Sequence, residues 1–188
     1  NGEGIPVNKE EAIKYYKMAI DKGEGYSMCN YGYMLQYGDG IEMNKEEAVR
    51  YYKMSIDKGN SYGISNYGYM LYHGEGTPMN KELAFTRYKE AADKDNSNGI
   101  YNYASMLYRG ETVSKNKAEA FANFKKAADK GHSNSMNNCG FMLEHGEGVP
   151  KNTEESIKYY KLSIRKGNVA ALYNYSCMIQ NESELQEE

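Results

Sequence analysis

The chain repeats itself every 36 residues, and this period limits it to a fold built from stacked copies of one unit. Five asparagines and five methionines mark the period without an insertion or deletion between them. They are Asn8, Asn44, Asn80, Asn116 and Asn152, and Met34, Met70, Met106, Met142 and Met178. Repeats of roughly 20–50 residues are typical of solenoids, in which each unit buries its apolar face against its neighbours. The period therefore predicts a repeat architecture.

Each repeat begins with a polar-capped helix, for which the second repeat serves as the example. Asn44 is a predicted N-cap, and Glu47 is placed to reach back to it in a capping box. Ala48 and Tyr52 then begin an apolar stripe at helical spacing. Gly59 supplies the left-handed residue at which such a helix commonly ends.

A second helix follows after a short polar turn and carries a small residue at its middle in every repeat. Small residues there permit close approach of a neighbouring helix, at some cost in helix propensity. They are Gly32, Gly68, Ala104, Gly140 and Ser176. The pattern predicts ten helices, at 9–22, 26–37, 45–58, 61–73, 81–94, 97–109, 117–130, 133–145, 153–166 and 169–180.

These helices form one predicted domain, an all-α solenoid over residues 1–181. It contains four complete helix pairs and a half-pair at each end. The acidic segment 182–188 lacks the periodic apolar residues, and we expect it to fray.

Charge and composition exclude several classes of function. A net charge of −3 argues against binding nucleic acid or an anionic membrane, which requires a basic stripe. A helical-repeat RNA reader is a rival that the asparagines and aromatics suggest, but the acidic balance disfavours it. The chain lacks a run of 18 apolar residues, so no membrane-inserted helix is expected. The three cysteines, odd in number, favour free thiols in a reducing, cytoplasmic compartment.

The repeat resembles the Sel1-like repeat family, which is related to tetratricopeptide repeats. The resemblance is carried by Ser27, Tyr31, Gly32 and Leu35, by the Gly-x-Gly turn at Gly38 and Gly40, and by Ala48 and Tyr52. It covers residues 2–181 and implies a right-handed α-solenoid that acts as an adaptor in multi-protein complexes. A cysteine-rich branch of the family contains penicillin-hydrolysing members. Because this chain lacks the cysteine pair of each such repeat, that activity is not implied.

A column of asparagines is the sharpest candidate for a binding site. It consists of Asn30, Asn66, Asn102, Asn138 and Asn174. In tetratricopeptide-like superhelices, a matching asparagine lines the concave groove and holds a peptide backbone, to which an amide can both donate and accept. Alternatively, each asparagine hydrogen-bonds the adjacent repeat and fixes the stacking.

Variable positions beside this column are the predicted source of selectivity, because tyrosine and arginine are common at binding hot spots. One column contains Tyr33, Tyr69, Ser105, Phe141 and Cys177, and a second contains Gln36, Tyr72, Tyr108, Glu144 and Gln180. From these and their neighbours, the predicted peptide-binding or protein-binding residues are Tyr33, Tyr69, Tyr72, His73, Tyr101, Tyr108, Arg109 and Phe141, together with the asparagine column.

The sequence predicts no catalytic residues, metal site or cofactor. His73 and His145 stand two repeats apart, and helices pack about 8–10 Å from one another, which is too far for joint coordination. The sequence lacks a Gly-x-Ser-x-Gly elbow and a phosphate-binding loop.

We therefore expect a non-catalytic scaffold that binds peptides or proteins in a concave groove. One alternative is a structural component of a larger assembly, with contacts at its ends or convex face. The other is a hydrolase like the cysteine-rich branch.

Overall fold

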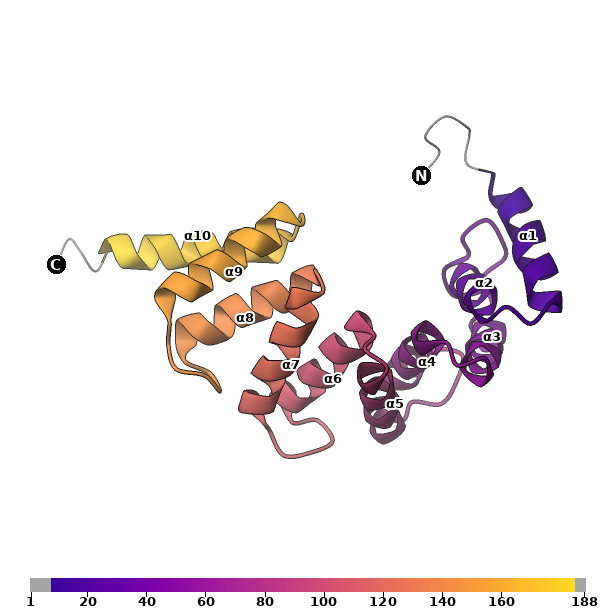
Figure 1. Cartoon of the computed structure of the whole chain (residues 1–188), viewed down its shortest axis with the longest axis horizontal. Helices are drawn as coiled ribbons and strands as arrows, with labels where there is room; N and C mark the ends of the chain where they lie inside the picture. The colour runs from indigo at the N-terminus through magenta and orange to yellow at the C-terminus, as the bar shows by residue number, and fades with distance from the viewer. Residues whose placement is uncertain (1–7, 185–188) are drawn as a thin grey trace. The chain divides into compact units, whose positions relative to one another are not determined.

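The structure of the protein is a computed structural model that describes the backbone of residues 8–184 and the side chains of residues 8–180. All regular secondary structure in this part of the chain is α-helical, in ten helices (Figure 1). They are α1 (Lys9–Asp21), α2 (Gly25–Tyr37), α3 (Lys45–Asp57), α4 (Ser61–His73), α5 (Lys81–Asp93), α6 (Ser97–Arg109), α7 (Lys117–Asp129), α8 (Ser133–His145), α9 (Thr153–Arg165) and α10 (Val169–Glu184). The odd-numbered helices are called A helices, and the even-numbered ones B helices.

The bounds of α1 to α9 lie within one residue of those predicted, whereas α10 runs on to Glu184 instead of ending at residue 180. The earlier B helices are followed by a left-handed glycine with φ between 67° and 69°: Gly38, Gly74, Gly110 and Gly146. The equivalent position in α10 is Glu182, and a residue with a Cβ rarely adopts that conformation, so the helix continues. Of the segment 182–188 that we expected to fray, residues 185–188 lie outside the described part of the chain.

The chain divides into two compact units, Asn1–Gly99 and Ile100–Glu188, with the boundary inside α6. Within the units, an A helix packs most extensively on the B helix that precedes it, as α3 does on α2, α5 on α4, and α9 on α8. The expectation that residues 1–181 stack as one continuous body stays a prediction.

The predicted asparagine caps are confirmed, but the reciprocal half of the capping box is wrong. Oδ1 of Asn44 accepts a hydrogen bond from the backbone N–H of Glu47 at 2.9 Å, and the same bond recurs at the other A helices. The backbone N–H of Asn44, however, donates to the carbonyl of Leu35 in the preceding B helix, also at 2.9 Å. The equivalent bonds join Asn80 to Leu71, Asn116 to Leu107 and Asn152 to Leu143. Because this N–H already has a partner, a glutamate that reaches back accepts from the side-chain amide of the cap instead, as Glu119 does from Asn116 Nδ2 at 2.9 Å.

The core depends on an aromatic ring of each A helix packed against a small residue of the B helix before it. A Cβ added to Gly68 would lie 2.8 Å from the Tyr88 ring, and one added to Gly140 would lie 2.7 Å from the Tyr160 ring. Tyr88 is 3% exposed and Tyr160 is fully buried. The predicted close approach of helices at this column is therefore confirmed. The methionine column is also buried, as core packing requires.

We predict that Gly68→Ala lowers the free energy of unfolding by about 1–2 kcal/mol, because the added methyl group would displace the Tyr88 ring. This is the net change, after the gain of about 1 kcal/mol that alanine brings to a helix interior. Urea unfolding followed by circular dichroism measures the difference. Ala104→Gly is the converse change at the same column and should cost about 1 kcal/mol. A more stable Gly68→Ala protein would show that the ring moves aside freely.

Candidate functional site

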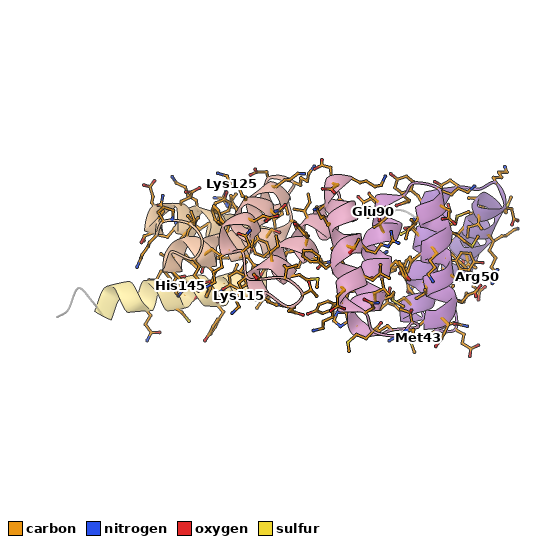
Figure 2. The ribbon with its side chains drawn as sticks, turned by 90° about the horizontal axis from the view of Figure 1, so that it is seen from below. Met43, Arg50, Glu90, Lys115, Lys125 and His145 are labelled. Atoms are coloured by element: carbon orange, nitrogen blue, oxygen red, sulfur yellow. The ribbon has the colours of Figure 1, made fainter. Side chains whose placement is uncertain are left out.

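One face of the B helices carries aromatic rings in pairs four residues apart, a spacing that places them on the same side of a helix. The ring centroids lie 4.6 Å apart for Tyr33 and Tyr37 in α2, and 4.3 Å apart for Tyr69 and His73 in α4. Phe141 and His145 repeat the arrangement in α8, also at 4.3 Å (Figure 2 labels His145). These three pairs are called the aromatic stripe. Tyr33 and Tyr37 are 51% and 54% exposed, so no other helix covers them.

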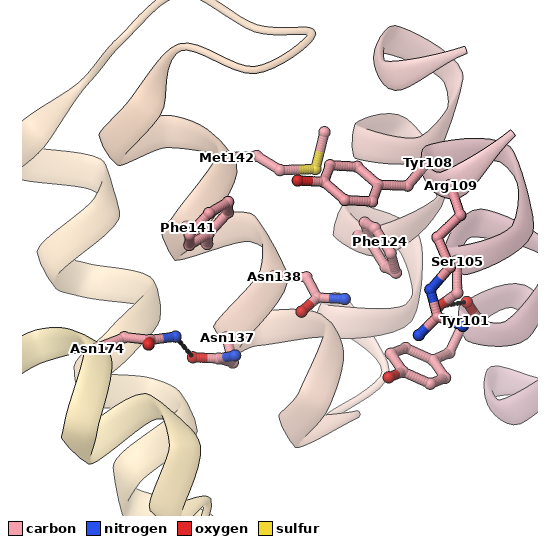
Figure 3. A pocket seen from close by; sticks show the side chains of 10 residues that line it. All are labelled: Tyr101, Ser105, Tyr108, Arg109, Phe124, Asn137, Asn138, Phe141, Met142 and Asn174. Atoms are coloured by element: carbon pink, nitrogen blue, oxygen red, sulfur yellow. Dashed lines mark hydrogen bonds between the residues drawn. The ribbon is translucent and has the colours of Figure 1, made fainter. Parts of the chain in front are cut away.

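In α6 the two stripe positions are held by Ser105 and Arg109, and a pocket opens beside them. The Ser105 hydroxyl donates to the carbonyl of Tyr101 at 2.9 Å, and the Arg109 guanidinium pairs with Glu111 at 3.3 Å. The pocket has a volume of about 300 Å³ and lies entirely within the second unit (Figure 3). Its lining residues are Tyr101, Ser105, Tyr108, Arg109, Phe124, Asn137, Asn138, Phe141, Met142 and Asn174.

The pocket brings together six of the predicted binding residues. They are Tyr101, Tyr108, Arg109, Asn138, Phe141 and Asn174. Asn30 and Tyr33 line a separate hollow of about 390 Å³ in the first unit, beside the ion pair of Lys9 and Asp39. Tyr69 and His73 belong to the aromatic stripe, and the Tyr72 ring lies 5.0 Å from the Lys81 ammonium.

The asparagine column serves repeat stacking at two positions. Asn66 Nδ2 donates to Cys29 Sγ at 3.4 Å, and Asn174 Nδ2 donates to Asn137 Oδ1 at 3.0 Å. Each bond reaches the preceding B helix, as the alternative interpretation of the column requires. Asn102 is half-buried in α6 and is not part of the pocket lining.

Asn138 differs from these two because the residue in the acceptor position of the preceding B helix is Tyr101. That ring lies against Phe124 at 5.8 Å and against His132 at 4.6 Å between centroids. It therefore presents an aromatic face where Cys29 and Asn137 present acceptor atoms. Figure 3 shows the Asn138 amide directed into the pocket.

Two residues that we expected in the groove instead hold buried hydroxyl groups. The Tyr52 hydroxyl donates to Gln36 Oε1 at 2.7 Å, and the Tyr160 hydroxyl donates to Glu144 Oε2 at 2.7 Å. Gln36 is only 3% exposed, so the interpretation of this column as a selectivity position is wrong there. A buried phenol needs a hydrogen-bond partner, and sequence spacing alone does not reveal which column supplies it.

The repeat that contains the pocket lacks this arrangement because its core ring is Phe124, which has no hydroxyl group. Tyr108 occupies the place of Gln36 and Glu144, and its hydroxyl donates to the carboxylate of Glu147. Glu147 also pairs with Lys117 at 3.0 Å. Burial and this hydrogen bond raise the pKa of Tyr108 to about 12, so the phenol is a neutral donor at physiological pH.

A family model of the Sel1 repeat matches residues 1–24, 25–60, 61–96, 97–132 and 133–168. The chain belongs to the Sel1 repeat family. Each complete Sel1 repeat here joins one B helix to the A helix that follows it. The resemblance drawn from the repeated turns and small residues is therefore confirmed.

Similar solved structures come from several bacteria. A protective antigen of uropathogenic Escherichia coli with an SLR fold is 26% identical, with a TM-score of 0.80, and the match covers 97% of this chain and 39% of that one. A Sel1 repeat protein from Oxalobacter formigenes is 25% identical, with a TM-score of 0.80 and coverage of 89% and 67%. The cysteine rich protein B of Helicobacter pylori is 21% identical, with a TM-score of 0.54 and coverage of 68% and 91%, and shows the fold alone.

This chain thus spans about two fifths of the Escherichia coli protein. No curated protein matches it in sequence. The predicted fold class, an all-α solenoid of helix-turn-helix repeats, is confirmed by the Sel1 repeat structures.

The cysteines and the acidic residues offer little reactive chemistry. Cys29 and Cys139 are buried, free thiols, and burial raises their pKa to about 11 and about 12, which suppresses the nucleophilic thiolate. Among residues 8–184, no group of three or more His, Cys, Asp or Glu side chains could hold a metal ion. None of the helices in that range is both long and apolar enough to cross a membrane.

We predict that Asn66→Ala destabilises the protein by about 0.5–1 kcal/mol relative to Asn30→Ala, since only Asn66 donates to the preceding B helix. Asn30 belongs to the same column but is exposed, so both changes bring the same gain in helix propensity. The comparison is made by urea unfolding of the two variants. Equal stabilities would mean that the bond to Cys29 contributes nothing to stacking.

A pH-dependent contribution to stability is predicted for His132, whose ring supports Tyr101. Its Nδ1 accepts the backbone N–H of Ser135 at 3.2 Å as the N-cap of α8, and burial lowers its pKa below 6.5. As the pH falls below about 6.5, the unfolded chain therefore binds the proton first and stability declines.

His132→Asn should remove this part of the pH dependence while keeping the cap. Asparagine is the natural cap at the equivalent positions Asn60, Asn96 and Asn168. As the pH falls from 7.5 to 5, the stability of the variant relative to the original chain should rise, by no more than about 1.4 kcal/mol per pH unit. Thermal unfolding of both proteins measures this difference. Parallel curves for the two proteins would contradict the assignment.

Proposed function

We propose that this Sel1 repeat chain is a non-catalytic adaptor that holds peptide or protein segments against the aromatic stripe and its asparagines. The observation that carries the proposal is the ring pair that recurs on α2, α4 and α8, in which Tyr33 and Tyr37 are more than half exposed. Tyrosine and other aromatic side chains are enriched at the centres of protein interfaces. Sel1 repeat proteins generally mediate protein–protein interaction, which supports the same conclusion.

The absence of catalysis is part of this proposal. Ser105 is the serine of the pocket lining, and its hydroxyl donates to the carbonyl of Tyr101 in the same helix. A serine nucleophile needs a base within hydrogen-bond reach, and no His, Asp or Glu lines the pocket.

The proposed partners are proteins or peptides, not nucleic acid, because the net charge is −3. Buried free thiols suit a reducing compartment, and we propose a cytoplasmic location on that ground.

A second candidate function, a structural component that binds by its end, is favoured by α10. Leu172 and Ile179 are 52% and 48% exposed. Their equivalents in α2, Met28 and Leu35, are 3% and 5% exposed because α3 covers them. The end of the repeat array thus offers an apolar face of the kind that a further helix would cover.

A double variant, Tyr69→Ser with His73→Ser, tests the stripe against that alternative. A partner is first isolated by affinity purification from the source cell, and its Kd is then measured by calorimetry. We expect the double variant to weaken binding roughly tenfold or more, as loss of hot-spot rings does. Tyr15→Ser is the matched control, because Tyr15 is 59% exposed but lies on an A helix. Loss of binding with Leu172→Ser but not with the double variant would favour the end-binding alternative.

A further inference from the structure

The pocket beside α6 lies where the ring pair of the other B helices is replaced by Ser105 and Arg109. In α2, α4 and α8, the first stripe position holds a ring that lies against the ring at the second. Ser105 replaces that ring by a hydroxymethyl group and leaves space for a ring in the same surroundings. A volume of about 300 Å³ is at the small end of ligand pockets and suits one side chain rather than a cofactor.

The walls of this space combine apolar side chains with the amides of Asn137, Asn138 and Asn174. Phe124 is 1% exposed and forms the back, and Phe141 and Met142 come from the facing helix α8 (Figure 3). Because Phe124 has no hydroxyl group, the back of the pocket has no counterpart of the buried hydrogen bonds that Tyr52 and Tyr160 make. An aromatic guest could pair with these rings at the offset or edge geometries that aromatic groups prefer.

An ion pair lies at the rim of the pocket. Arg109 is the charged residue of the lining, and its side chain is 57% exposed while it pairs with Glu111. A guanidinium carries five N–H donors, so a carboxylate of a bound peptide can share it with Glu111. Glu147, the acidic residue bonded to the lining residue Tyr108, is also engaged by Lys117.

We propose that this pocket receives an aromatic side chain of a bound peptide, with an acidic side chain of the same peptide paired to Arg109. The Asn138 amide, directed into the pocket, then bonds the peptide main chain, which offers both donors and acceptors. This inference rests on the proposed function and adds the class of segment that one part of the stripe recognises.

The test is selection from a random dodecapeptide phage-display library on the immobilised chain, followed by anisotropy titrations with the selected peptides. We expect the selected peptides to share an aromatic residue within about two positions of Asp or Glu. Ser105→Tyr should fill the pocket and weaken their binding at least tenfold, and it should fold because tyrosine is native at the equivalent Tyr33 and Tyr69. Asn98→Tyr is the control and should bind normally, because Asn98 is exposed on α6 outside the pocket lining and its equivalents Tyr26 and Tyr62 are natively tyrosine.

Arg109→Glu should weaken the binding of the same peptides by a similar factor. The loss of affinity should be larger for peptides with two acidic residues. Arg50→Glu is matched to it, because Arg50 is exposed on α3 and pairs with Glu47, also at 3.3 Å (Figure 2). Peptides that bind without an acidic residue, or that tolerate Ser105→Tyr, overturn the inference. If such peptides are lost with the Tyr69 and His73 double variant, the proposed function stands without it. Failure to select any peptide counts against both.

Discussion

The contact between an A-helix ring and a small residue of the preceding B helix determines how every repeat is arranged. At Gly68 and Gly140 the ring lies closer than a Cβ would allow, so the two helices approach until main chain and ring touch. This fixes which face of each B helix is buried. The opposite face, with its asparagines and stacked rings, is left for other uses, and the candidate site is a consequence of the packing beneath it.

The same contact explains why the pocket occurs in one particular repeat. Where the A-helix ring is a tyrosine, as at Tyr52 and Tyr160, its hydroxyl takes Gln36 or Glu144 as a partner. Phe124 needs no such partner, which allows Tyr108 to turn to Glu147. Two differences therefore distinguish this repeat. The core ring lacks one oxygen atom, and Ser105 stands where other repeats have a stripe ring. Together they change which side chains are available at the surface.

Much of the fold could be predicted because the same helix pattern recurs in five repeats. The 36-residue period, the asparagine caps and the glycine ends locate the helices almost to the residue. The hydrogen-bond partners between helices could not be predicted, since they depend on side-chain direction rather than on sequence spacing. The bond from the Asn44 N–H to Leu35 and the bond from Asn66 to Cys29 carry no signal in the pattern. For the site, the sequence identified residue types that line the pocket, but not that Ser105 creates it by being small.

The bond from each asparagine N–H to a leucine carbonyl has a consequence for how the array melts. It joins the N-cap of an A helix to the last turn of the B helix before it, as at Asn80 and Leu71 or at Asn152 and Leu143. When a B helix frays, the next cap therefore loses an anchor, and the disturbance passes to the A helix that follows. Nearest-neighbour coupling of this kind makes linear arrays unfold in blocks. Here part of that coupling runs through the peptide backbone, where a change of side chain does not remove it.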